Sequence, residues 1–154
     1  MSQSYKPYLL LLVAGVAGVI VWEIIGNYIA PLIIGGKLSP IGLIISLFKN
    51  TIGINPGRDI AMVLHFFTGI VGYPVAYLIA TKIVRSFGPI VDGLALGVGT
   101  WILALGVFAP LAGFPFMLNF GNLTWMSLGG HVVYGLVVTL TYVALLNRKS
   151  AAPA

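Results

Sequence analysis

The sequence predicts an all-α membrane protein with four transmembrane helices. Of its 154 residues, 59% are hydrophobic and only 7% are charged, whereas a soluble domain has about 25% charged residues. The apolar residues also occur in runs of about 20, the length at which a helix crosses a bilayer. Inside a bilayer only helices and closed barrels satisfy the backbone, and these runs lack the alternation of barrel strands. The composition therefore excludes a soluble enzyme, a nucleic-acid-binding domain and a disordered chain.

Charged residues and turn formers bound the predicted spans. The first span stops near Pro31, and the second lies between Arg58 and Lys82. Residues 93–147 contain no Asp, Glu, Lys or Arg, and this stretch is long enough for two spans. Pro, Gly and Asn cluster within residues 110–122 and separate the two. The predicted spans are residues 8–29, 60–81, 91–111 and 124–146, within a single transmembrane domain of residues 1–154.

The connection between the first two spans contains a further apolar segment, residues 38–48. Eleven residues are too few to span, so we expect a short interfacial or re-entrant helix on the outer face. The apolar run at the N-terminus is longer than the core of a signal peptide, so we interpret it as a permanent helix.

The basic residues predict the topology. The side with more Lys and Arg in short loops faces the cytoplasm. One side carries Lys6, Lys82, Arg85, Arg148 and Lys149, and the other carries Lys37, Lys49 and Arg58. We therefore expect a multi-pass protein of a bacterial inner membrane, with both termini in the cytoplasm.

The two halves of the chain share a pattern. Trp22 is followed by Ala-Pro-Leu at residues 30–32, and Trp101 is followed at the same distance by Ala-Pro-Leu at residues 109–111. The next span of each half holds one His, His65 or His131, in the form H-x-x-x-G-[IL]-V. The pattern predicts two tandem helix hairpins that form a parallel pseudo-repeat.

Three ionisable side chains fall inside the predicted spans at nearly one depth. At 1.5 Å of rise per residue, Glu23 lies about 9 Å, His65 about 8 Å and His131 about 10 Å below the outer ends of their helices. Ionisable groups at such depth are costly and usually face the interior of a bundle. We therefore expect these three side chains to approach one another.

A haem b held by two histidines is the first hypothesis for this region. Two neutral imidazoles on different helices, His65 and His131, can face each other across an iron atom. Gly69 and Gly135 follow one turn after each His and leave room for the macrocycle. Arg58, two turns outward from His65 on the same face, is placed to pair with a propionate.

Two other hypotheses remain open for the same residues. His65, His131 and Glu23 form a set that suits Fe(II) or Zn(II). Alternatively, each His donates a structural hydrogen bond between helices, and Glu23 is hydrogen-bonded within the bundle or pairs with one His.

The sequence contains no hydrolytic or transferase motif, so an enzyme is not favoured, although a redox subunit fits. Three function classes follow: a haem-binding electron-transfer subunit that exchanges electrons with quinone, an accessory subunit of a larger membrane complex, or a small ion or solute transporter. The expected partners are the lipid bilayer and other membrane subunits or quinone, and a homo-oligomer stays open.

Residues 64–142 resemble a family of small bacterial four-helix integral membrane proteins. The resemblance rests on the runs LHFFTGIVGYPVAYLIA, GLALGVGTWILALGVFAPLAG and GGHVVYGLVVTLTY. That family has a His near the start of helices two and four and a glycine-rich third helix. The resemblance implies the four-helix architecture and the pair His65 and His131, and it implies no activity.

Overall fold

The computed structural model describes residues 6–150, and of residues 6, 149 and 150 it describes the backbone alone. This part of the chain is helical and contains no strand. It has four helices that are long and apolar enough to cross a membrane. Lys6 and Lys149, which contribute to the predicted topology, have side chains outside the described part.

The four long helices match the predicted spans closely. They run over Pro7–Ile34, Gly57–Ile83, Pro89–Leu111 and Asn122–Arg148. The first consists of α1 (Lys6–Ile24), η1 (Ile25–Ile29) and α2 (Ala30–Ile34), and the second consists of α4 (Gly57–Phe67), η2 (Thr68–Gly72) and α5 (Tyr73–Ile83). The third consists of α6 (Pro89–Trp101), η3 (Ile102–Phe108) and α7 (Ala109–Leu111). The fourth is the single helix α8 (Asn122–Ser150). Between the first two lies α3 (Pro40–Ile52), and η4 (Phe116–Phe120) precedes α8.

Three of the long helices contain a proline, and each changes to a π-helical segment just before it. A proline in a helix lacks an N–H, and its ring meets the carbonyl four residues back. The residue before each proline instead donates its N–H to the carbonyl five residues back, as Ala30 does to Ile25. Tyr73 and Ala109 do the same with Thr68 and Ala104. The sequence predicts that the first helix ends near Pro31, but the wider turn lets it continue to Ile34.

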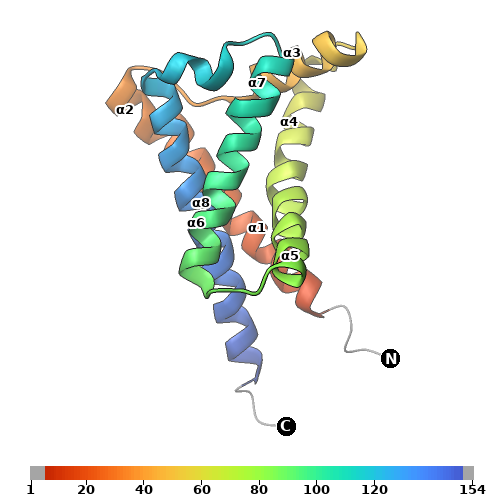
Figure 1. Cartoon of the computed structure of the whole chain (residues 1–154), viewed down its shortest axis with the longest axis vertical. Coiled ribbons are helices and arrows are strands. Elements are labelled where there is room, and N and C mark those ends of the chain that lie inside the picture. The colour runs from red at the N-terminus through yellow and green to blue at the C-terminus, as the bar shows by residue number, and fades with distance from the viewer. Residues whose placement is uncertain (1–5, 151–154) are drawn as a thin grey trace.

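The fourth helix is the centre of the bundle. α8 packs against α1 on one side and α6 on the other, and α1 also packs against η2 (Figure 1). Glycines permit the closest approach: an added Cβ at Gly97 of α6 would lie 2.6 Å from Cα of Val132 in α8. The fully buried residues Leu11 and Val138 lie in the α1–α8 core. Outward-facing side chains are largely apolar, as a lipid-facing surface requires.

The two ends of the bundle differ. α1 begins, α8 ends and α5 connects to α6 at one end (Figure 1). α3 lies across the other end, beside α4 and α7. Residues Met117–Phe120 form a left-handed turn there, with positive φ at four non-glycine positions. The Thr124 hydroxyl donates to the Met117 carbonyl over 2.6 Å and helps to hold this strained backbone.

Candidate functional site

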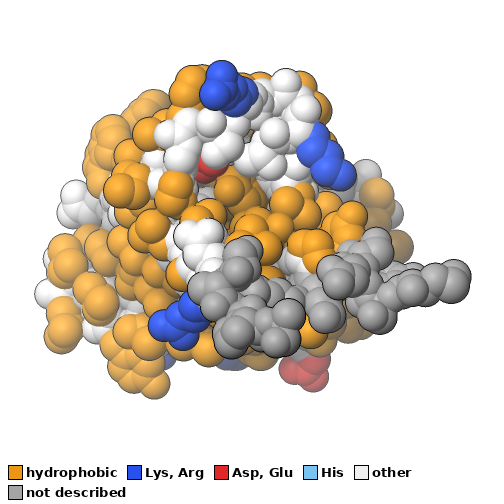
Figure 2. All heavy atoms as spheres, turned by 90° about the horizontal axis from the view of Figure 1, so that it is seen from below, with side chains coloured by type: hydrophobic (Ala, Val, Ile, Leu, Met, Phe, Trp, Pro, Cys, Tyr) orange, Lys and Arg blue, Asp and Glu red, His pale blue; other side chains and the backbone are white. Residues whose placement is uncertain are grey.

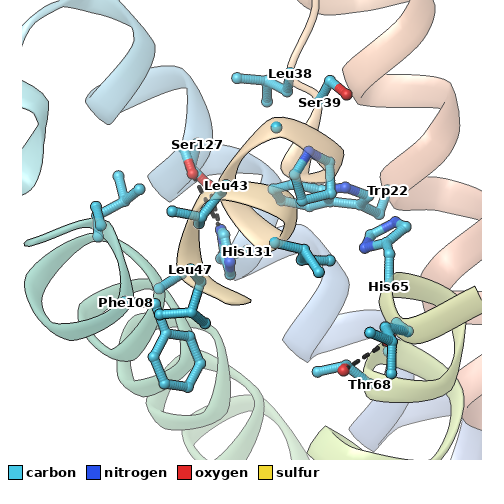
Figure 3. A pocket seen from close by; sticks show the side chains of 18 of the residues that line it. Trp22, Leu38, Ser39, Leu43, Leu47, His65, Thr68, Phe108, Ser127 and His131 are labelled. Atoms are coloured by element: carbon cyan, nitrogen blue, oxygen red, sulfur yellow. Dashed lines mark hydrogen bonds between the residues drawn. The ribbon is translucent and has the colours of Figure 1, made fainter. Parts of the chain in front are cut away.

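A cavity of about 540 Å³ lies under α3, between the ends of the long helices. Both histidines line it, together with Trp22 of α1 and the underside of α3 (Figure 3). Most of the lining side chains are apolar; besides the imidazoles, the polar ones are Lys37, Ser39, Thr68, Tyr73, Ser127 and Tyr134. Its lining includes Trp22, Lys37, Leu43, Leu47, His65, Gly69, Ser127, His131 and Tyr134. A cavity of this size and character matches the pockets that hold small molecules and cofactors.

The first imidazole belongs to a three-residue network. Nε2 of His65 lies 2.8 Å from Oε1 of Glu23. The Asn27 amide donates to the other carboxyl oxygen, Oε2 of Glu23, over 2.8 Å. A carboxylate can only accept, so with Glu23 ionised Nε2 of His65 carries a hydrogen. The lone pair of a neutral His65 then lies on Nδ1.

The second imidazole is held by its own helix. Nδ1 of His131 lies 2.8 Å from the Ser127 carbonyl oxygen, one turn earlier in α8. A carbonyl oxygen is only an acceptor, so Nδ1 must be the protonated nitrogen. The Trp22 ring meets the His131 ring edge-on, with centroids 4.5 Å apart. These contacts fix the ring and leave the lone pair of a neutral His131 on Nε2.

Each histidine therefore has one ring nitrogen held and the other unpaired. In the described part of the chain every buried side-chain nitrogen and oxygen has a hydrogen-bond partner. Because neither Nδ1 of His65 nor Nε2 of His131 has one, both atoms are accessible rather than sealed in protein. A ring that donates one N–H to a carboxylate or a carbonyl and keeps the other nitrogen free is the usual arrangement of a metal-ligating histidine.

α3 covers the cavity and is attached at both ends. The chain before it is fixed because the Leu38 N–H donates to the Gly26 carbonyl of η1 over 3.1 Å. Near its C-terminus, the Asn50 amide donates to the Ala112 carbonyl over 2.7 Å. Leu43 and Leu47 of α3 line the cavity. The helix thus separates the two imidazoles from the space above it with apolar side chains.

The structure brings together some of the predicted site residues and not others. Glu23 contacts His65, and Gly69 lines the same cavity as both histidines. Arg58 is exposed and does not line the cavity. Gly135 is buried in the α6–α8 contact, where an added Cβ would lie 2.7 Å from the Gly97 nitrogen. Its small size therefore serves helix packing and leaves no space for a ligand.

The predicted three-residue metal set is not assembled. Residues 6–150 contain no group of three or more His, Asp or Glu side chains that could hold a metal ion. Glu23 is already hydrogen-bonded to His65 and Asn27, while His131 is held by Ser127. The histidines are thus available as a pair, without the carboxylate as a third ligand.

Sequence reasoning missed three residues of the site. Asn27 lies four residues after Glu23, a spacing that places both on one helix face, so the pair was open to prediction. Lys37 lines the mouth of the cavity and Ser127 holds His131. No local pattern marks either of these two residues, because their roles depend on how α3 and α8 meet the rest of the chain.

No family model, curated protein or solved structure matches this chain.

Proposed function

We propose that this chain is a multi-pass membrane protein that binds haem b in the cavity under α3 and acts as an electron-transfer or cytochrome-type subunit. One observation supports this most strongly: His65 and His131, on different helices, line one cavity, and each has one ring nitrogen held and the other unpaired. A haem with two histidine ligands needs two such nitrogens.

The residues that would hold the cofactor have distinct tasks. His131 would ligate through Nε2 and His65 through Nδ1, because the opposite nitrogens are occupied. When bound, the haem iron supplies one-electron redox chemistry. The Ser127 carbonyl fixes the tautomer of His131. The Glu23 carboxylate makes His65 a more basic ligand, which donates its electron pair to the iron more strongly. The apolar side chains of α3 keep water away from the ligands.

A basic group at the cavity mouth supports the same proposal. The sequence places Arg58 opposite a propionate, but Arg58 does not line the cavity. Lys37 does line it and is exposed at its rim. We assign to Lys37 the propionate contact expected of Arg58, because an ammonium at the rim can meet a carboxylate while the macrocycle lies among apolar side chains.

The arrangement in the membrane is part of the proposal. We infer two tandem hairpins related as a parallel pseudo-repeat, since the π-helical segments before Pro31 and Pro110 both end seven residues after a tryptophan, Trp22 or Trp101. In this proposal α3 lies in the outer interface of a bacterial inner membrane, both termini are cytoplasmic, and quinone is the redox partner. The four-helix membrane family that residues 64–142 resemble is the proposed family.

The absorption spectrum of the purified protein tests this function. The protein is produced with full haem supply and extracted in mild detergent. We expect a Soret band that His65→Ala and His131→Ala each reduce strongly, while Arg58→Ala, a change outside the cavity, leaves it intact. Lys37→Ala should weaken haem retention. A colourless wild-type protein, or a band that survives both histidine changes, would contradict the proposal.

A further inference from the structure

A second cavity lies at the opposite end of the molecule from the histidines. It has a volume of about 450 Å³ and runs between α5 and α6. Small side chains form its walls: Ala76 and Ala80 on α5, and Ala95 and Gly99 on α6. All four of these residues are exposed, because α5 and α6 make few contacts with each other. We call this hollow the α5–α6 groove; it opens on the lipid-facing side of the bundle.

The length of the groove matches one leaflet of a bilayer. Its lining begins at Tyr73 on the second long helix, which ends at Ile83, and reaches Val84 just beyond it; on the third it runs from Val91 to Leu103. At 1.5 Å per residue the helical stretches Tyr73–Ile83 and Val91–Leu103 rise about 15 and 18 Å. Half of the hydrocarbon core of a bilayer is about 15 Å thick. An acyl chain of a lipid in that leaflet therefore fits the long dimension of the groove.

A cationic side chain lies at the mouth of the groove. Arg85 lines it, is exposed, and has no acidic group within ion-pair distance in residues 6–150. Asp92, the acidic residue of the same lining, is occupied: it accepts from the Ser86 hydroxyl over 2.5 Å and from the Phe87 N–H over 3.1 Å. Figure 2 shows this end of the molecule, where Lys and Arg side chains stand out on a mainly apolar surface.

We propose that the α5–α6 groove binds an anionic phospholipid, with an acyl chain along the small residues and the phosphate at Arg85. A guanidinium forms paired hydrogen bonds to phosphate oxygens, and basic pockets between transmembrane helices on the cytoplasmic side bind anionic headgroups. The apolar length of the groove suits the acyl chain of the lipid, and the charge of Arg85 at its mouth suits the phosphate.

Lipid retention by purified protein tests the proposal. Wild-type protein in neutral detergent is mixed with phosphatidylglycerol or with phosphatidylcholine of the same acyl chains, and bound lipid is counted by native mass spectrometry. We expect retention of phosphatidylglycerol above phosphatidylcholine. Arg85→Gln should weaken phosphatidylglycerol binding about fivefold, the effect of one basic group near an anionic lipid surface. Inorganic phosphate alone should neither bind nor raise the melting temperature.

Two further variants keep the test decisive. Lys82→Gln removes the same charge from a side chain that does not line the groove, so it should retain phosphatidylglycerol as wild type does. Ala95→Leu should reduce the binding of both lipids because it narrows the groove, with helical content unchanged by circular dichroism. Equal retention of the two lipids by wild type, equal effects of Arg85→Gln and Lys82→Gln, or a dimer that Ala95→Leu separates would each overturn the proposal.

Discussion

Nε2 of His65 lies 2.8 Å from Oε1 of Glu23, and this contact joins the first two long helices inside an apolar bundle. The His65 side chain is 15% exposed and lines the cavity, whereas the Glu23 side chain is 35% exposed and does not line it. The contact also sets the orientation of the His65 ring. It occupies one nitrogen of His65 and thereby determines which nitrogen the ring offers to a ligand.

A double-mutant cycle of Glu23→Ala and His65→Ala should reveal this pair as a coupling energy. We expect about 1 kcal/mol of coupling in the free energy of unfolding. Either single change already removes the hydrogen bond between Glu23 and His65, so the second change has no such bond left to remove. Reversible unfolding in mixed micelles supplies the four free energies. Additive effects of the two changes would show that the contact does not stabilise the protein.

The position of Trp22 against His131 depends on the lack of a side chain at Gly130. An added Cβ there would lie 2.6 Å from Cζ3 of Trp22, so Gly130→Ala should destabilise by about 1–3 kcal/mol and should displace the indole. Gly129→Ala is the matched control, because nothing lies within 4 Å of its added Cβ. That control should be neutral or slightly stabilising. Chemical unfolding monitored by tryptophan fluorescence compares the two variants, and equal stabilities would count against this packing.

The Tyr134 hydroxyl links the fourth long helix to the second. It donates to the Gly69 carbonyl of η2 over 2.5 Å, and Tyr134 is buried. Tyr134→Phe should lower the free energy of unfolding by about 1 kcal/mol, because a buried carbonyl loses a partner. Tyr28→Phe serves as the control, since Tyr28 is 71% exposed. Thermal unfolding in detergent is the measurement, and a Tyr134→Phe protein as stable as the control would argue against this bond.

The Asn50 contact with the Ala112 carbonyl should control access to the cavity. The chain has no cysteine, so a single cysteine in place of Leu47, on the cavity side of α3, reports access without background. Asn50→Ala should speed its maleimide labelling several-fold, because one attachment of α3 is lost. Thr51→Ala, whose hydroxyl bonds within α3 to the Leu47 carbonyl, should leave the rate unchanged. Equal rates in both variants would mean that Asn50 does not restrain α3.

The four long helices could be predicted from the sequence because a bilayer imposes one dominant constraint on a chain. About 20 apolar residues, ended by charges or turn formers, leave little choice of structure. The ends of the helices were less predictable. Pro31 does not end the first helix, because the π-helical segment before it already accommodates the missing N–H.

The site could be predicted only in part. Common depth and the cost of ionisable groups in a membrane bring Glu23, His65 and His131 to one region. Depth does not determine which ring nitrogen faces the cavity, and no local pattern predicts the Ser127 contact that orients His131. Gly135 and Arg58 were placed by helical spacing alone, which cannot separate a residue at a ligand from one at a helix contact or on the surface.

Electron paramagnetic resonance of the ferric protein, loaded with one haemin per chain, tests the central claim most directly. Two imidazole ligands should give a low-spin signal in wild type, and His65→Ala and His131→Ala should each convert it to high spin or lose the haem. A wild-type protein that binds no haemin, or one that is already high-spin and unchanged by His65→Ala, would contradict the assignment of His65 and His131 as a ligand pair.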